Sequence, residues 1–409
     1  MTSAREILLS AGIKPRLRRL IRAACIAILA LSCTQCARHS QAAISCGRQD
    51  KRAISLEMAI SGCNTVIQSG NGTPNEIAMA FSNRGAAYQE QGNYDQAMSD
   101  LNQAIRLRPN FPSALYNLGV LYQARGETDR SIQMFTDAIR FKSDFAEAFN
   151  NRGAAYNRKK EYDLALRDFD QAILLNPDLA QAFVNRGVAE IGKGDPDAAI
   201  QDSDQAIRLK PDYPVAFQDR GIGYAKKGEY AQAIQDFDQA LRLTPDDPRA
   251  FNNRGQTYLL KGDYDRAMED INQAIRLDPN YADALNNRCW ARGLENKSLN
   301  EGMSDCNESL RLKPNSADTL GSLGLIYLRM SQYGQAIASS TAGLALDPKS
   351  AETLYVRGIA RLRSGDSRGG EDDIAAAKTL NPKIMETYAI FPGMQPAGHM
   401  FKQQDDHER

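Results

Sequence analysis

Glycine recurs at a fixed interval of 34 residues through most of this chain of 409 residues. Six consecutive glycines keep the interval without exception, Cys289 takes the next place, and two more glycines follow after one inserted residue. These eight glycines are Gly85, Gly119, Gly153, Gly187, Gly221, Gly255, Gly324 and Gly358. A fixed period of this length is typical of a chain built from stacked copies of one small unit. The chain is therefore predicted to be a repeat array rather than a set of independent domains.

Each repeat predicts two helices joined by a tight turn. Apolar side chains recur with helical spacing over residues 180–191, a turn begins at Gly194, and a second helix over residues 198–209 is closed by Pro211. A lone pair of helices cannot bury its apolar faces, so each pair must pack on its neighbours and the stack becomes a solenoid. The recurring glycines let the two helices approach closely. A large side chain at Gly187 is therefore expected to be costly.

The repeat resembles that of the tetratricopeptide repeat family. Six of the recurring positions are followed three residues later by tyrosine: Tyr88, Tyr122, Tyr156, Tyr224, Tyr258 and Tyr327. The resemblance implies an all-α fold, an α-solenoid in which antiparallel helix pairs form a right-handed superhelix. Nine repeats are predicted over residues 78–384. Residues 43–77 resemble a degenerate N-terminal capping repeat, and residues 385–409 are predicted to be a C-terminal cap over repeat nine followed by a disordered tail.

The N-terminus has the pattern of a secretory signal. Residues 1–22 carry six basic side chains and one acidic one, and residues 23–31 are uninterrupted apolar. This apolar stretch is shorter than the roughly 20 residues that a membrane-spanning helix needs. The pattern predicts a signal peptide over residues 1–42 and an exported, periplasmic protein. Lipidation at Cys33, which would place the protein on a membrane, and a retained N-terminus are the alternatives.

An arginine precedes the recurring position in seven of the nine repeats, and an aspartate stands in the second predicted helix of the same seven. The arginines are Arg84, Arg152, Arg186, Arg220, Arg254, Arg288 and Arg357, and the aspartates are Asp100, Asp168, Asp202, Asp236, Asp270, Asp305 and Asp373. The two repeats that lack the arginine, with Leu118 and Leu323, also lack the aspartate. This covariation within one chain predicts an ion pair between the two helices of each repeat.

Four cysteines follow the predicted signal peptide, and four cysteines allow three pairings. Cys289 and Cys306 occupy facing positions of repeat seven and are 17 residues apart. Cys46 and Cys63 have the same separation, and their surroundings align with the repeat. Two disulfides within repeats are therefore predicted, which suits an oxidising compartment. A zinc site is the weaker alternative, because no pair of cysteines of the CxxC type occurs after residue 42.

Composition excludes several function classes. Basic and acidic residues number 50 each, so no positive field exists to attract nucleic acid. The chain has only three histidines, all near its ends, which are too few for a histidine-based catalytic site or a metal site with several histidines. The glycines do not have the spacing of a phosphate-binding loop. The sequence predicts a non-enzymatic protein without cofactor, metal or small-molecule substrate, whose partner is a protein or peptide.

In the resembling family, ligands usually lie in a concave groove lined by the first helices. Position six of these helices, which faces the groove, holds asparagine in six of the first seven repeats: Asn83, Asn117, Asn151, Asn185, Asn253 and Asn287. We call these residues the asparagine ladder. It resembles the repeat domain of the O-linked N-acetylglucosamine transferases, where asparagines hold a peptide backbone, and an amide can both donate and accept. Alternatively, the asparagines only bond the neighbouring backbone.

The predicted groove becomes apolar toward its C-terminal half. Its candidate contacts are Trp290, the only tryptophan, with Leu259, Leu294, Leu325 and Leu328. Aromatic side chains on a rigid support often dominate binding. Packing between neighbouring helices is the alternative role of these residues. The function predicted is an adaptor that binds an extended peptide or a partner protein. A lipid-anchored outer-membrane assembly or secretion factor and a self-associating scaffold are the alternatives.

Overall fold

The computed structural model describes residues 45–47 and 55–396. In this part of the chain the regular structure is entirely α-helical, and no helix is long and apolar enough to cross a membrane. The chain divides after Lys193 into two compact units. The predicted signal peptide with Cys33, and the end of the predicted tail, lie outside the described residues.

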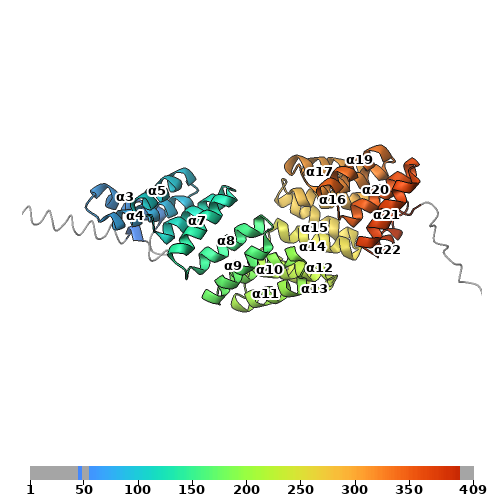
Figure 1. The fold of residues 1–409 in the computed structure, drawn as a ribbon. Coiled ribbons are helices and arrows are strands. Elements are labelled where there is room, and N and C mark those ends of the chain that lie inside the picture. Colours follow the sequence, from blue (N-terminus) through green and yellow to red (C-terminus); the bar gives the residue numbers. More distant parts are fainter. Residues whose placement is uncertain (1–44, 48–54, 397–409) are drawn as a thin grey trace, which may run out of the picture. The chain divides into compact units, whose positions relative to one another are not determined.

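The first unit contains eight helices in its described part, each packed beside the next (Figure 1). They are α3 (Leu56–Ser69), α4 (Pro74–Glu90), α5 (Tyr94–Leu107), α6 (Pro112–Ala124), α7 (Thr128–Phe141), α8 (Ala146–Arg158), α9 (Tyr162–Leu175) and α10 (Ala180–Lys193). Helix α3 packs on α4, which opens repeat one with a capping box at Thr73 and Glu76. The residues predicted to form a degenerate repeat therefore supply a helix that covers the first complete repeat.

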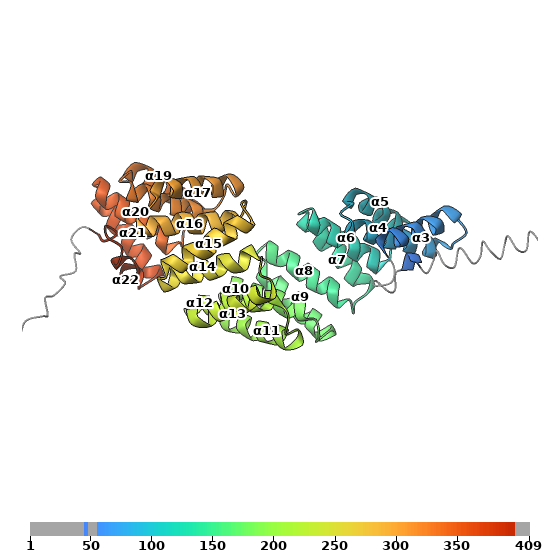
Figure 2. The same cartoon turned by 180° about the vertical axis from the view of Figure 1, so that it is seen from behind.

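The second unit continues the same alternation of helices in its described residues (Figure 2). Its helices are α11 (Pro196–Leu209), α12 (Pro214–Lys226), α13 (Tyr230–Leu243), α14 (Pro248–Lys261), α15 (Tyr264–Leu277), α16 (Ala282–Glu295), α17 (Leu299–Leu312), α18 (Ala317–Arg329), α19 (Tyr333–Leu346), α20 (Ala351–Ser364), α21 (Ser367–Leu380) and α22 (Ile384–Ala389). The pairs from α4/α5 to α20/α21 are repeats one to nine, and α10 and α11 fall on the two sides of the division.

Helix boundaries follow local capping chemistry. The helix predicted over residues 198–209 begins two residues earlier, at Pro196, because the Asp195 side chain accepts the Ala198 amide at 3.0 Å. Gly194 before it has a φ of 88°, a left-handed conformation that glycine adopts without steric cost. The turn predicted at Gly194 is confirmed.

The recurring glycines are sites of close helix approach. A Cβ built at Gly119 would lie 2.6 Å from the Phe135 ring, and one at Gly153 would lie 2.7 Å from the Phe169 ring. Both rings are fully buried and come from the second helix of the same repeat. Any side chain at these positions would separate the two helices. Glycine at these two positions is therefore required by packing, and the expected cost at Gly187 stays a prediction.

Six of the seven predicted arginine–aspartate pairs are confirmed as bidentate ion pairs. Nε and Nη2 of each arginine donate to the two oxygens of one aspartate over 2.6–2.9 Å. The aspartate side chains are 7–8% exposed and the arginines 15–22%. The pairs are Arg84–Asp100, Arg152–Asp168, Arg220–Asp236, Arg254–Asp270, Arg288–Asp305 and Arg357–Asp373. The seventh predicted pair, Arg186 with Asp202, stays a prediction.

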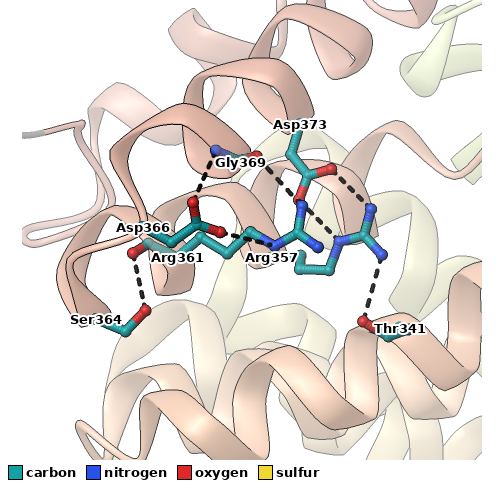
Figure 3. Close-up of polar contacts among 7 residues, drawn as sticks. All are labelled: Thr341, Arg357, Arg361, Ser364, Asp366, Gly369 and Asp373. Atoms are coloured by element: carbon teal, nitrogen blue, oxygen red, sulfur yellow. Dashed lines mark hydrogen bonds and ion pairs between the residues drawn. The ribbon is translucent and has the colours of Figure 1, made fainter.

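Each of these arginines also reaches the preceding repeat. Its third nitrogen, Nη1, donates to a polar side chain on the second helix of the repeat before, for example to Asp204 from Arg220 at 2.6 Å. Figure 3 shows this arrangement in repeat nine, where Arg357 contacts Thr341 of α19 and Asp373 of α21. Arg361 adds a second guanidinium to Asp373 at 2.9 Å. The arginine therefore joins three helices, whereas the sequence predicted a bond between two.

Both predicted cysteine pairs lie at bonding distance. The Sγ atoms of Cys46 and Cys63 are 2.17 Å apart, and those of Cys289 and Cys306 are 2.00 Å apart. All four residues are buried, at 0–4% exposure. The second pair joins α16 to α17 directly beside the Arg288–Asp305 ion pair, so repeat seven is held by two cross-links next to each other.

Candidate peptide-binding site

Three members of the asparagine ladder hold neighbouring first helices together. In each case Nδ2 donates over 2.9 Å to the residue one place earlier in the preceding repeat. The three bonds are Asn151 to Tyr116 Oη, Asn185 to Asn150 Oδ1 and Asn287 to Asn252 Oδ1. Asn287 is also buried, at 9% exposure. These asparagines therefore stabilise the stacking of the repeats, a role close to the alternative that the sequence left open.

The other three members keep their amides available. Asn83, Asn117 and Asn253 are half-buried and make no side-chain hydrogen bond within the described residues. Repeat five has Asp219 in this position, and its Oδ2 is buried without a hydrogen-bond partner in the described chain. Burial raises the pKa of Asp219 to about 7, and the positive charge of Arg249 acts in the opposite direction. The ladder is thus divided between structural amides and free ones.

Two of the predicted groove leucines have no surface for a partner. Leu325 is 0% exposed and Leu328 is 1% exposed, and both belong to the core of the last three repeats. The prediction that they line the groove is wrong, because neighbouring first helices and the C-terminal segment enclose them. Leu259 and Leu294, at 9% and 8% exposure, are buried as well.

Trp290 of α16 lies between core and surface. It is half-buried, packs against two core clusters of the second unit, and meets the Tyr388 ring edge-on at a centroid distance of 6.4 Å. It also lines a cavity of about 440 Å³ together with Leu259, Leu260 and Leu294. Trp290 therefore combines the packing role and the groove-lining role that the sequence treated as alternatives.

The cavity beside Trp290 is closed on one side by the C-terminal segment. Helix α22 lies beside α14 in both views (Figures 1 and 2), and Tyr388, Ile390 and Phe391 complete the cavity wall. Tyr388 stacks on Tyr355 at 4.7 Å, and Phe391 meets Tyr264 edge-on at 5.8 Å. Burial raises the pKa of Tyr388 well above its usual value. The cap predicted over repeat nine thus also reaches repeats six and seven.

Three successive carbonyls of this segment accept hydrogen bonds from the groove. Arg329 Nη1 donates to the Pro392 carbonyl at 2.5 Å, Arg363 Nη2 donates to that of Gly393, and Tyr355 Oη donates to that of Met394 at 2.7 Å. The donors belong to the first helices of repeats eight and nine. A stretch of backbone is therefore already bound in this groove by side chains of the repeats.

Arg329 and Arg363 were not among the site residues predicted from the sequence. A signal was present, since both stand five residues after the recurring glycine of their repeat and are 34 residues apart. The corresponding residues of repeats six and seven are Leu260 and Leu294. A change from leucine to arginine at one groove position in successive repeats could have marked the place where the lining turns from apolar to cationic.

These features define a solenoid of stacked helical repeats. Profiles of the tetratricopeptide repeat match residues 85–126, 114–146, 146–179, 180–213, 219–282 and 317–350, which together cover more than half of the chain. The chain belongs to the tetratricopeptide repeat family. Repeats of this family mediate protein–protein interaction.

Solved structures of helical-repeat proteins resemble this chain at low sequence identity, and the first of them, with a TM-score above 0.5, has the same fold. A tetratricopeptide repeat protein from Parabacteroides merdae is 20% identical, covers 62% of this chain and 99% of its own, and has a TM-score of 0.54. Pseudomonas aeruginosa pilF is 23% identical, with coverages of 52% and 96% and a TM-score of 0.45. The APC/C hetero-tetramer Cut9-Hcn1 is 13% identical, with coverages of 82% and 92% and a TM-score of 0.47. No curated protein matches the sequence significantly.

Proposed function

We propose that this protein is a non-catalytic adaptor that binds a segment of a partner protein in the groove of its second unit. The observation that carries the proposal is the cavity of about 440 Å³ between α14, α16 and α22. Leu260 and Ile390 on its wall are 57% and 68% exposed, although most large apolar side chains of this unit are buried. An apolar cavity with exposed aliphatic groups at its edge suits an anchoring side chain of a partner.

Leu260 connects this cavity to the free part of the asparagine ladder. It also lines a second cavity of about 100 Å³, together with Asn253 and Ile222. Asn253 has an unbonded amide that can donate to and accept from a peptide group. A bound segment would place an apolar side chain beside Leu260 and Trp290 while its backbone bonds Asn253.

Export to the periplasm is part of the proposal. The basic and apolar pattern of residues 1–42 and the two cysteine pairs at bonding distance both support an oxidising compartment. Acyl labelling of Cys33 would instead indicate the lipid-anchored assembly factor. Concentration-dependent light scattering of the purified protein would indicate the self-associating scaffold.

The test is site-specific crosslinking at the cavity. A photoreactive amino acid at Leu260 is expected to capture a partner from periplasmic extract, and the same group at Leu346, which is 49% exposed on α19, is the control. The crosslinked segment, made as a synthetic peptide, should bind the wild-type chain and shift the fluorescence of Trp290, the only tryptophan.

Leu260→Glu should lower the affinity for this peptide at least tenfold, since the bound peptide would bury a charge in the cavity. Leu346→Glu should leave its affinity unchanged. Equal affinity of the peptide for Leu260→Glu and wild type would reject the cavity as the binding site.

A further inference from the structure

The C-terminal segment is held in the groove by a tight turn. Residues 391–394 have Pro392 in the second place, Gly393 with a φ of 75° in the third, and a bond from the Met394 amide to the Phe391 carbonyl at 3.1 Å. These are the features of a type II turn. Apart from the buried Phe391 and Met394 side chains, the turn is bound mainly through its backbone carbonyls.

The two arginines that bind the turn have no carboxylate partner among the described residues. The remaining bonds of Arg329 go to the carbonyls of Gly293 and Leu294, at 2.8 and 2.9 Å. Burial lowers the pKa of the Arg329 guanidinium, and the neighbouring positive charge of Arg363 lowers it further. Two adjacent cations therefore face only neutral acceptors, and a carboxylate would form stronger, charge-assisted bonds with them.

Both guanidinium groups converge on Gly393. A Cβ built there would lie 3.5 Å from Arg363 Nη2 and 3.8 Å from Arg329 Nη1. An acidic side chain starting at this point would carry its carboxylate to the two guanidiniums. Aspartate has the required reach and, among residues other than glycine, is one of those that best tolerate a positive φ. Glu352 and Glu386 line the neighbouring cavity and would repel a second acid there. The acidic side chain is therefore better placed beside the two arginines.

We propose that residues 391–394 are an intrachain ligand of the groove, which a partner segment with aspartate in the place of Gly393 displaces. The inference rests on the proposed function, because both concern the groove of the second unit. It specifies the partner as a segment in which an aromatic residue is followed, two positions later, by aspartate. The neutral intrachain turn then acts as a competitor that keeps weaker segments out.

The first test uses the unaltered full-length chain and labelled synthetic peptides of residues 384–396. The peptide with Gly393→Asp is expected to bind at least tenfold more tightly than the one with Gly393→Asn, as measured by fluorescence anisotropy. Aspartate and asparagine both tolerate the positive φ of position 393, and only aspartate carries a charge. The difference should shrink as salt is added. Equal affinities of the two peptides, or no binding of either, would overturn the inference.

The second test alters the intrachain ligand. Gly393→Asp in the full chain should strengthen the bonds between the chain's own turn and the two arginines. The affinity of this variant for the aspartate peptide should therefore fall at least tenfold, whereas Gly393→Asn should leave the affinity for that peptide unchanged. Arg363→Gln should remove the preference for aspartate over asparagine, and Arg158→Gln, at the corresponding position of repeat three, should keep it. If Leu260→Glu abolishes partner binding but Gly393→Asp changes nothing, the proposed function stands and the intrachain ligand is rejected.

Discussion

Two sets of arginines in the same chain differ in what they face. The arginines of the ion pairs between helices, such as Arg220, bind a buried aspartate with two nitrogens and a second polar side chain with the third. Arg329 and Arg363 of the groove bind only backbone carbonyls. The first set is saturated by its own repeats and has a structural role. The second retains unneutralised charge, and this makes its position suitable for a ligand.

Removing an arginine of the first set should have the largest effect on stability. Arg220→Leu leaves Asp236, which is 7% exposed, as a buried charge without a partner. The free energy of unfolding should fall by about 3–5 kcal/mol, measured by chemical denaturation. Adding Asp236→Met, the residue type that repeat two has at this place, should restore most of the loss. An equal loss in the single and double variants would contradict the pairing.

Repeat seven offers a second way to weigh the ion pair, because a disulfide lies beside it. Reduction of the Cys289–Cys306 bond should lower the free energy of unfolding by about 3 kcal/mol. With the bond intact, Arg288→Leu should cost less than Arg220→Leu, since the disulfide keeps α16 and α17 together. Mass spectrometry of the unreduced protein after thiol alkylation should find all four cysteines unlabelled. Labelling of Cys289 or Cys306 would show that the two thiols are free and that repeat seven has no disulfide beside its ion pair.

Asp219 is the opposite case, a buried carboxylate oxygen without a partner. Its folded-state pKa of about 7 lies above the ordinary value of 3.8, so its ionised form is disfavoured in the folded protein. Stability should therefore fall as pH rises from about 4 to 7 and level off above that range. Asp219→Asn should raise the free energy of unfolding at pH 8 by about 2–4 kcal/mol and leave it nearly unchanged at pH 4. Equal gains at both pH values would show that ionisation is not the cause.

Removing a groove arginine should have the smallest effect. Arg363→Gln leaves no acid unpaired and removes one hydrogen bond at an exposed carbonyl. The free energy of unfolding should fall by less than about 1 kcal/mol in chemical denaturation. A loss as large as that of Arg220→Leu would place Arg363 with the structural arginines and end the distinction between the two sets.

Much of the fold could be predicted from the sequence because repeats compare a chain with itself. Arg220 and Asp236 covary with their counterparts in other repeats, and Cys46 aligns with Cys289, so their contacts did not require a structure. The candidate site could be predicted less well from the sequence. Leu325 and Leu328 resemble groove residues by register alone, and only the packing of neighbouring helices shows that both are buried.

By itself, the sequence determined the repeat, the helix pairs, the ion pairs and the cysteine register, because these depend on short separations that recur with a fixed period. Only the tertiary structure decided where the non-repeating C-terminal segment lies. The contact between Arg329 and Pro392 joins residues 63 positions apart, and no periodicity predicts it. Likewise, the structure alone showed which asparagines bond a neighbouring helix and which remain free, because the answer depends on the side chain that the adjacent repeat presents.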